Sequence, residues 1–564
     1  NLDTDDITFK GGDIRIGRAR ISNGGQSLLV DGGLSGNHSD TLNVRMEKFN
    51  ISLLNSFLMD GQLDLRGLAT GRARLVSPTK PNLSILAGIV CDSTYIAGRP
   101  AGEVQLGSVW NETEERFDFR LGNRLGDGQN IAVEGFLRPS DKRIRADVDL
   151  NRLDMGYASP ILDGIFNRFE GGLDGKIHVG GTLDNLRIGS EGMQLVDGIL
   201  GIDFPQVAYH VAGPISVDTE GLHFNGVTLS DGIDGKGSVN GSLLFGGFKN
   251  LKMDTHVQFD RMKVLGIPGV ARPVSGQVYG SGRVDITGPF NALVLSVDAR
   301  TVKDGDLHIP LSTGSSQATG DLLVFKEPEV EVEEDPYEKM MVSGKDRRKK
   351  SKNDLDIRLR VRATPAVTAY IDIGENSLQG LGSGLIDLDV RPNDKLFTIN
   401  GDYTLSQGNF RFSALNMVSR EFTIQDGSRI RFNGEVMDSD LNVTGVYTTK
   451  ADISTLLSTT STDQSSSRRQ VNCIIGISDK LRNPQLQFDI EIPELDPGTE
   501  GLVNSALNTE DKVMKQFLYL LIANSFLPND DSGIISSGGS NMLVSNVTGI
   551  MAGQLNNIFQ KLDI

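Results

Sequence analysis

The feature that most constrains this chain is a repeated alternation of apolar and polar side chains. Apolar residues occupy every second position in several segments, of which Leu396–Leu405 is the clearest. A period of two is typical of a β-strand with one apolar face. The alternating residues are Phe397, Ile399, Tyr403 and Leu405; Phe117, Phe119 and Leu121; Ile144, Ala146, Val148 and Leu150; Leu355, Ile357, Leu359 and Val361; and Ile430 and Phe432. No helical period appears before about Asp154, which predicts a long series of half-apolar strands.

Composition favours a thin β structure over a compact globule. Glycine supplies 66 of 564 residues, above its usual share of about 7%, whereas aromatic residues make up only 6%. Such a chain is rich in turns and poor in the bulky side chains that fill a wide core. A structure in which each segment buries its apolar face against its neighbours satisfies both facts. The usual division of a chain of this length into three or four globular domains fits them less well.

Charge and cysteine content exclude several functions. The formal net charge is −17, which disfavours a nucleic-acid partner because a phosphate backbone selects basic surfaces. The two cysteines, Cys91 and Cys473, are far apart in the sequence, so we expect small apolar fillers. The apolar run Phe517–Leu527 is too short to cross a hydrocarbon core of about 30 Å. Because the chain starts at Asn1 in a strand-like segment, we interpret it as part of a longer protein.

Two sequence markers indicate an internal repeat of roughly 105 residues. One is a glycine followed by apolar residues two and four places later, and the other lies about 22 residues upstream. The glycine marker occurs at Gly71–Leu75, Gly175–Val179, Gly282–Ile286 and Gly384–Leu388, and the upstream marker at Phe49–Ile51, Leu153–Met155 and Phe259–Arg261. Between them, Ile161, Leu162, Ile165, Phe166 and Phe169 in Tyr157–Phe169 have helical spacing. Each repeat is therefore predicted to hold one short helix and a run of strands.

Further changes along the chain suggest four regions. These are a repeat region (1–326), a charged insertion (327–354), a second β region (355–496) and a helical region (497–564). In the insertion, acidic residues up to Glu338 precede a basic cluster from Lys345 to Lys352. We interpret it as a solvated loop, with contact to anionic head groups as the alternative.

Two amphipathic helices are predicted near the end of the chain, at Asp511–Leu527 and Asn541–Leu562. Pro528 is expected to stop the first. We expect them to cap or plug the β structure, and the alternative is an interfacial membrane role, although their polar faces are not rich in Lys or Arg. The side chains proposed as a cap or gate are Phe517, Leu521, Ile550, Leu555, Ile558 and Phe559.

No motif in the sequence points to a reaction, a cofactor or a metal. The six histidines have no second ligand at a useful spacing, and no phosphate-binding loop is present. Gly380, Gly382 and Gly384 imitate a dinucleotide fingerprint but precede a strand-like segment, so we expect a strand bend. Asp231–Gly235 resembles a calcium turn, yet a hairpin turn explains it better. We therefore interpret the protein as a non-enzyme without cofactors.

Several segments of the C-terminal third resemble the TamB family, the inner-membrane component of the translocation and assembly module. They are Phe422–Ile430, Gly434, Asp440–Tyr447, Asn483–Ile490, Pro493 and Gln516–Leu527, with Thr364–Ile371 and Leu378–Gly384 upstream. The similarity is specific from about Leu355 to Leu562, and upstream it is only that of AsmA-like repeats.

The resemblance implies an elongated sheet rolled into an apolar trough, the β-taco, in the periplasm of a Gram-negative bacterium. It also implies a missing N-terminal anchor in the inner membrane and an outer-membrane barrel of the TamA or BamA type as partner. The implied activity is movement of phospholipids between the membranes, with outer-membrane protein assembly as an older assignment. The charged insertion departs from the family pattern. The family continues past the position of Ile564 into strands that engage the barrel, which leaves that contact open.

Alternation then assigns residues to the trough. The predicted lining is Phe117, Phe119, Ile144, Val148, Ile177, Val179, Val284, Ile286, Ile357, Leu359, Val361, Phe397, Ile399, Leu405, Leu441 and Val443. Their neighbours Arg358, Arg360, Thr398, Asn400 and Asn442 are predicted to face solvent.

Two classes of function are compatible with these assignments. One is a conduit that binds phospholipid acyl chains, and the other is a scaffold that offers sheet edges to β-barrel clients. An adhesive or carbohydrate-binding solenoid is disfavoured, because Trp110 is the only tryptophan.

Overall fold

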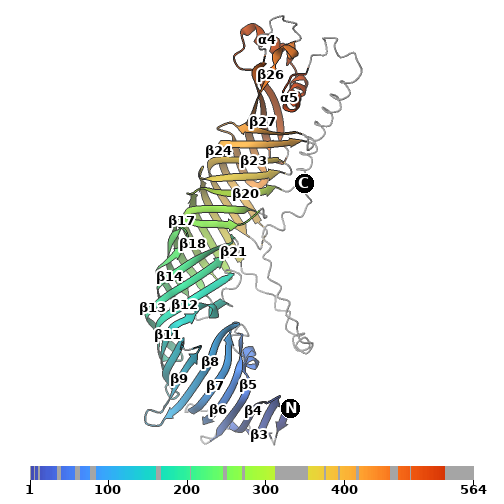
Figure 1. Ribbon diagram of the computed structural model, residues 1–564. Helices are drawn as coiled ribbons and strands as arrows, with labels where there is room; N and C mark the ends of the chain where they lie inside the picture. Colours follow the sequence, from blue (N-terminus) through green and yellow to red (C-terminus); the bar gives the residue numbers. More distant parts are fainter. Residues whose placement is uncertain are drawn as a thin grey trace. The chain divides into compact units, whose positions relative to one another are not determined.

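The structure is a computed structural model in which the chain divides into two compact units (Figure 1). Unit 1 comprises Asn1–Phe259 and Thr287–Phe290, and unit 2 comprises Asp260–Ile286 and Asn291–Ile564. The described residues form 28 strands and a few short helices, so the prediction of a mainly β chain is confirmed. Those residues are 2–4, 7–10, 13–34, 40–57, 64–76, 84–126, 128–159, 167–202, 205–245, 251–269, 274–311, 354–373, 376–391, 394, 396–414, 418–457, 468–482 and 484–527.

In unit 1, strands that follow one another in the chain pair with each other, and all these pairs are antiparallel. Both β1 and β2 pair with β3, and sequential pairing then continues from β3 to β16. The strands are β1 (Leu2–Thr4), β2 (Ile7–Lys10), β3 (Asp13–Asn23), β4 (Gln26–Leu34), β5 (Thr41–Asn50), β6 (Leu65–Val76), β7 (Ser84–Ile96), β8 (Arg99–Asn111), β9 (Arg116–Arg124), β10 (Ile131–Arg138), β11 (Arg143–Asp154), β12 (Arg168–Thr182), β13 (Asn185–Ile202), β14 (Val207–Val217), β15 (Gly221–Ser230) and β16 (Lys236–Leu244). Next come β17 (Lys252–Ile267) and β18 (Ser275–Pro289), which contribute to both units.

Unit 2 interrupts this simple order once. Its later strands are β19 (Ala292–Thr301), β20 (Gly305–Leu311), β21 (Asp354–Ala363), β22 (Val367–Ile373), β23 (Asn376–Arg391), β24 (Leu396–Ala414), β25 (Val418–Ile424), β26 (Arg429–Asp452), β27 (Arg468–Lys480) and β28 (Gln485–Glu491). The pairs β19–β21 and β20–β22 are parallel, whereas the pairs from β21–β23 to β27–β28 are antiparallel. Each parallel pair therefore joins a strand before the charged insertion to a strand after it, and most of the insertion is outside the described residues.

The helices are short, and two helix predictions need correction. The described helices are η1 (Ile51–Phe57), η3 (Met155–Ala158), α3 (Ile453–Leu457), α4 (Pro497–Ala506) and α5 (Glu510–Ala523). A short helix, η1, starts at the Phe49–Ile51 marker and ends before the Gly71–Leu75 marker, where the repeat pattern predicted a helix. In the second repeat Phe169 lies in β12 rather than in a helix, and Ile161, Leu162, Ile165 and Phe166 lie outside the described residues. The helix predicted up to Leu527 ends at Ala523, because Asn524 adopts a left-handed conformation with φ 50° and caps it. The predicted helix Asn541–Leu562 lies outside the described residues.

A common backbone irregularity marks the predicted repeat. Lys48, Arg152 and Arg261 have φ near 50°. Each donates its N–H to a side-chain oxygen of the residue before a marker glycine, namely Thr70, Asp174 and Ser281. A bulge of this kind bends a strand and increases its twist. It gives the repeat markers a shared physical role, whereas the domain boundaries proposed from the sequence remain a prediction.

The best-formed core lies in unit 2, where the helices meet the last strands. Phe422, Val471, Cys473, Phe517 and Leu520 are at most 1% exposed and belong to one cluster there. A second cluster joins Leu405, Ile424, Ile430 and Val443. Elsewhere many apolar strand residues are only half-buried.

Candidate functional site

Four neighbouring strands of unit 2 carry an ordered set of apolar side chains on one face. The strands β19, β21, β23 and β24 pair in a register that places apolar residues directly opposite one another. The three resulting rows, which we call the apolar lattice, are Leu295, Ile357, Val390 and Phe397; Val297, Leu359, Leu388 and Ile399; and Ala299, Val361, Ile386 and Gly401. Ile386 is buried, whereas the other side chains of the lattice are half-buried. A side chain with this exposure retains apolar surface that a ligand can cover.

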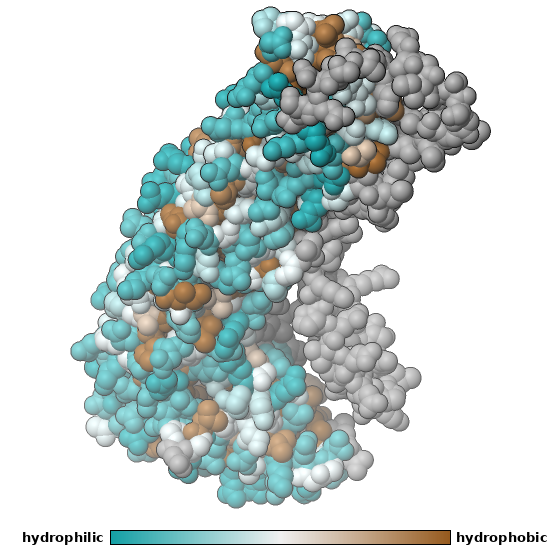
Figure 2. All heavy atoms as spheres, turned by 45° about the horizontal axis from the view of Figure 1, so that its top comes forward, coloured by the Kyte–Doolittle hydropathy of each residue, from teal (hydrophilic) through white to brown (hydrophobic). Residues whose placement is uncertain are grey.

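The opposite face of the same strands is charged. Arg360 lies between Asp298 and Asp387 in register, and its Nε donates to Asp387 Oδ1 at 2.8 Å. Arg358 donates to Asp356 at 2.8 Å, and these hydrogen bonds raise the pKa of both guanidinium groups. Hydrophilic residues also predominate on the face of the molecule that Figure 2 shows. On β19, β21 and β23 the charged residues alternate with those of the apolar lattice, so the charged face stays solvated and the lattice lies on the opposite face.

The expected orientation agrees with the exposure of most of the solvent-side residues. Arg358, Arg360, Asn400 and Asn442 are exposed, whereas Thr398 is half-buried. The partners that complete the rows were not predicted to line the trough, although Ile386 and Leu388 belong to the Gly384–Leu388 repeat marker. These partners are Leu295, Val297, Ile386, Leu388 and Val390. Their own alternation was the available signal. Whether the lattice lines a groove remains a prediction.

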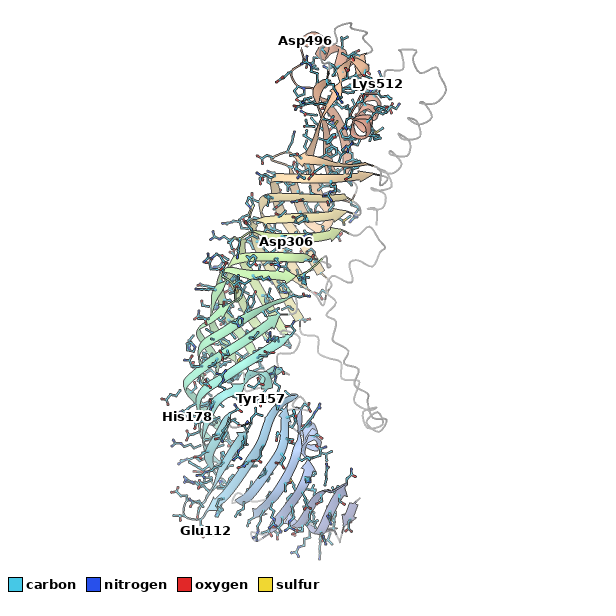
Figure 3. The ribbon with its side chains drawn as sticks, viewed as in Figure 1. Glu112, Tyr157, His178, Asp306, Asp496 and Lys512 are labelled. Atoms are coloured by element: carbon cyan, nitrogen blue, oxygen red, sulfur yellow. The ribbon has the colours of Figure 1, made fainter. Side chains whose placement is uncertain are left out.

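Unit 1 brings six predicted lining residues together in the same manner. Phe117, Phe119, Ile144, Val148, Ile177 and Val179 lie in three cross-strand rows on β9, β11 and β12, joined through β10. Of these six, Phe117 is buried and the others are half-buried. Figure 3 labels His178, which lies between Ile177 and Val179 in β12. It is 2.7 Å from Asp147. This hydrogen bond lowers the pKa of the Asp147 carboxyl.

The remaining predicted lining residues are in different surroundings. Leu405 and Val443 are 2% and 4% exposed and lie in a closed cluster with Leu441 packed against it, so protein already covers them. Val284 and Ile286 lie in β18 and are half-buried.

Helix α5 packs against the last strands of the sheet and covers apolar side chains of β25 and β28. Phe517 and Leu521 are each 1% exposed, and the Phe517 ring lies 4.8 Å from Phe488 and 6.1 Å from Phe422, centroid to centroid. Asp496, labelled in Figure 3, caps α4 by accepting the N–H groups of Gly498 and Thr499. Of the predicted cap residues, Ile550, Leu555, Ile558 and Phe559 lie outside the described residues.

Polar contacts fix the chain where α5 ends. Arg420 Nε donates to the Leu521 carbonyl at 2.8 Å, and the hydroxyls of Tyr447 and Thr449 both donate to Asn524 Oδ1. Gln516, which is 8% exposed, bonds both the N–H and the carbonyl of Leu527. The helix is therefore attached to the sheet by hydrogen bonds as well as by its apolar stripe.

The accessibility of Cys473 provides a test of this packing. Both cysteines are buried, as expected for small apolar fillers, and both are free. Burial raises the pKa of the Cys473 thiol to about 12, so at pH 8 only about one thiol in ten thousand is ionised. We expect maleimide to leave Cys473 unlabelled in the folded protein at pH 8 and to label it rapidly in denaturant. Mass spectrometry of the labelled peptide measures this. Rapid labelling without denaturant would show that the helices leave the sheet.

The other sequence features are structural. Asp231–Gly235 forms the turn between β15 and β16, with Asp231 Oδ1 accepting two backbone N–H groups, and Gly380, Gly382 and Gly384 lie within β23. Over the described residues no group of three His, Cys, Asp or Glu side chains is placed to hold a metal ion. Within the same residues no helix is long and apolar enough to cross a membrane.

Comparison with protein families decides the affiliation. The family model of the TamB C-terminal domain matches residues 225–564. The chain belongs to the TamB family. No curated protein and no solved structure is similar enough to the chain to count as a match. The TamB match starts in β15, well upstream of the segments that carried the sequence resemblance. Membership gives the chain a place in the translocation and assembly module of the cell envelope, a non-enzymatic transport and assembly system to which TamA also belongs.

Proposed function

We propose that this TamB-family chain is a hydrophobic conduit that moves phospholipids between the inner and outer membranes. The apolar lattice is the observation that supports this role most directly. Its rows are continuous across four strands, and its side chains retain exposed apolar surface. In this proposal the full-length protein is anchored in the inner membrane, crosses the periplasm and meets an outer-membrane barrel of the TamA or BamA type.

Physical chemistry explains why acyl chains suit such a surface. Each methylene group removed from water contributes about 0.8 kcal/mol, and the interaction is non-directional. Rows without polar groups offer a lipid tail no single preferred position, so a tail can slide from one row to the next. The charged opposite face keeps the sheet in solution during this movement.

A second candidate is a scaffold for the assembly of outer-membrane barrels by strand addition. Among the described strands β28 pairs only with β27, which leaves its second edge as the position where a client strand could add. However, α5 contacts β28, and its Phe517 ring packs against Phe488 of that strand. The conduit is therefore the better supported proposal.

Photo-crosslinking tests the conduit directly. A photoreactive amino acid at Phe397 is expected to capture phospholipid in envelope membranes, whereas the same group at the neighbouring Thr398 is not. Both residues are half-buried and lie on the same strand, so the comparison isolates the face. Equal lipid capture at both positions, or capture only at Thr398, would overturn the conduit. Capture of barrel-protein clients instead of lipid would support the scaffold.

A further inference from the structure

One face of the first strands of unit 1 carries a set of arginines in register. Leu29 lies opposite Arg20 on one side and Arg45 on the other, and Arg45 lies opposite Arg72. A bulge in β3 between Ile16 and Ala19 places Arg15 opposite Gly33, on the same side of β4 as Leu29. Alternation adds Arg74 on β6 to this face. All five arginines, which we call the arginine face, are exposed.

These arginines have no counter-ion within the part of the chain that the structure describes. None of their guanidinium groups forms an ion pair there. The carboxylates nearby make other contacts or none: Asp31 accepts a hydrogen bond from Asn43 at 2.8 Å, and Glu47 accepts one from Ser27 at 3.3 Å. Asp3 is opposite Arg20 in register without an ion pair, and Asp40 lies beside Gly33.

Several exposed basic residues elsewhere in unit 1 do lie within ion-pair distance of carboxylates, as in Arg120–Glu134 at 3.4 Å, Lys176–Asp149 at 3.0 Å and Arg152–Asp197 at 2.6 Å. By contrast, Arg45 and Arg72 are direct cross-strand neighbours. Like charges in this position destabilise a sheet. A chain with a net charge of −17 thus concentrates unpaired positive charge on one face.

Exposed aliphatic side chains adjoin the arginine face. Leu86 lies opposite Arg74 and is 40% exposed, and Val109 on β8 is 64% exposed on the same side of the sheet. In the next row Arg72 is followed by Gly88 and Gly107, which have no side chains, and then by Arg120 on β9, which pairs with Glu134. The face therefore combines guanidinium groups with a shallow apolar margin.

We propose that the arginine face binds the surface of a membrane that contains anionic phospholipids. Guanidinium groups pair with head-group phosphates in bidentate fashion, and Leu86 and Val109 enter the boundary between head groups and acyl chains. The aliphatic margin favours a lipid surface over an acidic protein or a nucleic acid, because neither of those needs it. Within unit 1 the apolar rows of β9, β11 and β12 lie on the opposite side of the sheet from this surface.

Vesicle binding tests the proposal. The 564-residue chain should bind vesicles of phosphatidylcholine with phosphatidylglycerol and not vesicles of phosphatidylcholine alone, and salt should weaken the binding. Each arginine near an anionic surface contributes roughly a fivefold change in affinity. The triple variant Arg20→Gln, Arg45→Gln and Arg72→Gln should therefore bind on the order of 100-fold more weakly.

The control is the triple variant Arg145→Gln, Arg152→Gln and Arg168→Gln. It makes the same change in net charge on unit 1 but removes arginines that already have carboxylate partners. We expect its affinity for vesicles to stay within about threefold of the unmodified chain, with circular dichroism confirming that both variants fold. Equal losses in the two variants would show that net charge alone acts and would overturn the proposal. If soluble polyglutamate competes for the chain more effectively than phosphatidylglycerol does, the arginine face would be assigned to an acidic protein instead.

Discussion

The double variant Leu359→Arg and Ile399→Arg is expected to fold and to transfer no phospholipid. Both residues lie in the middle row of the apolar lattice, with Leu388 between them. An ionised guanidinium among acyl chains costs several kcal/mol, which is enough to block movement of a lipid tail past this row. Folding should survive, because both positions are half-buried and a long arginine side chain can extend its charged end to water.

The matched control places both arginines on the other face of β24, the strand that carries Ile399. Replacing Thr398 and Asn400 adds the same two charges to the charged side of the sheet, and we expect transfer close to that of the unmodified chain. Phospholipid exchange between donor and acceptor membranes is the measurement, with thermal unfolding as the check on folding. Normal transfer by a folded Leu359→Arg, Ile399→Arg variant would remove the conduit proposal.

Phe517→Ala is expected to cause the largest loss of stability. Its ring is 1% exposed and contacts two other aromatic rings, so the substitution leaves a cavity at the centre of the core that joins α5 to the last strands. A buried phenylalanine replaced by alanine costs about 3–5 kcal/mol. A chain with two units need not unfold in one step, so the effect is best measured locally. We expect much faster hydrogen exchange at the backbone amides of β27 and β28.

Leu502→Ala serves as the control for this measurement. Leu502 lies on α4 beside the same core but is 53% exposed, so its truncation should change stability by no more than about 0.5 kcal/mol. Unchanged exchange in β27 and β28 after Phe517→Ala would show that α5 rests on the sheet without stabilising it.

Alternation predicted the strands well because burial on one face imposes a period of two on the sequence. It predicted which side of β21 is charged, since Arg358 and Arg360 have no other way to reach water. Helix boundaries were harder, because they depend on backbone conformation at single residues. The left-handed Asn524 ended α5 before Pro528 could, and Phe169 was drawn into β12 by pairing with Leu200.

The candidate site was only partly accessible from the sequence. Alternation identifies an apolar face but does not say what covers it, because cover comes from segments far away in the chain. Leu405 and Val443 have the same pattern as Leu359, yet they are buried in one cluster with Ile424 and Ile430. The row partners on β19 were missed for a related reason. They meet β21 across the charged insertion, and a parallel pairing leaves no turn signal in the sequence.

The parallel pairs β19–β21 and β20–β22 affect the order in which unit 2 folds. Antiparallel neighbours joined by short turns can pair as soon as both strands have been synthesised. By contrast, Ala292 can pair only when its partner Asp354, 62 residues later in the chain, is also available. Such distant contacts slow folding, because loop entropy is lost before the contacts form. Before residue 354 is available, the edges of β19 and β20 that later pair with β21 and β22 have unpaired backbone groups. Such unpaired edges favour aggregation. A chaperone that binds these edges of β19 and β20 would therefore protect the incomplete sheet most effectively.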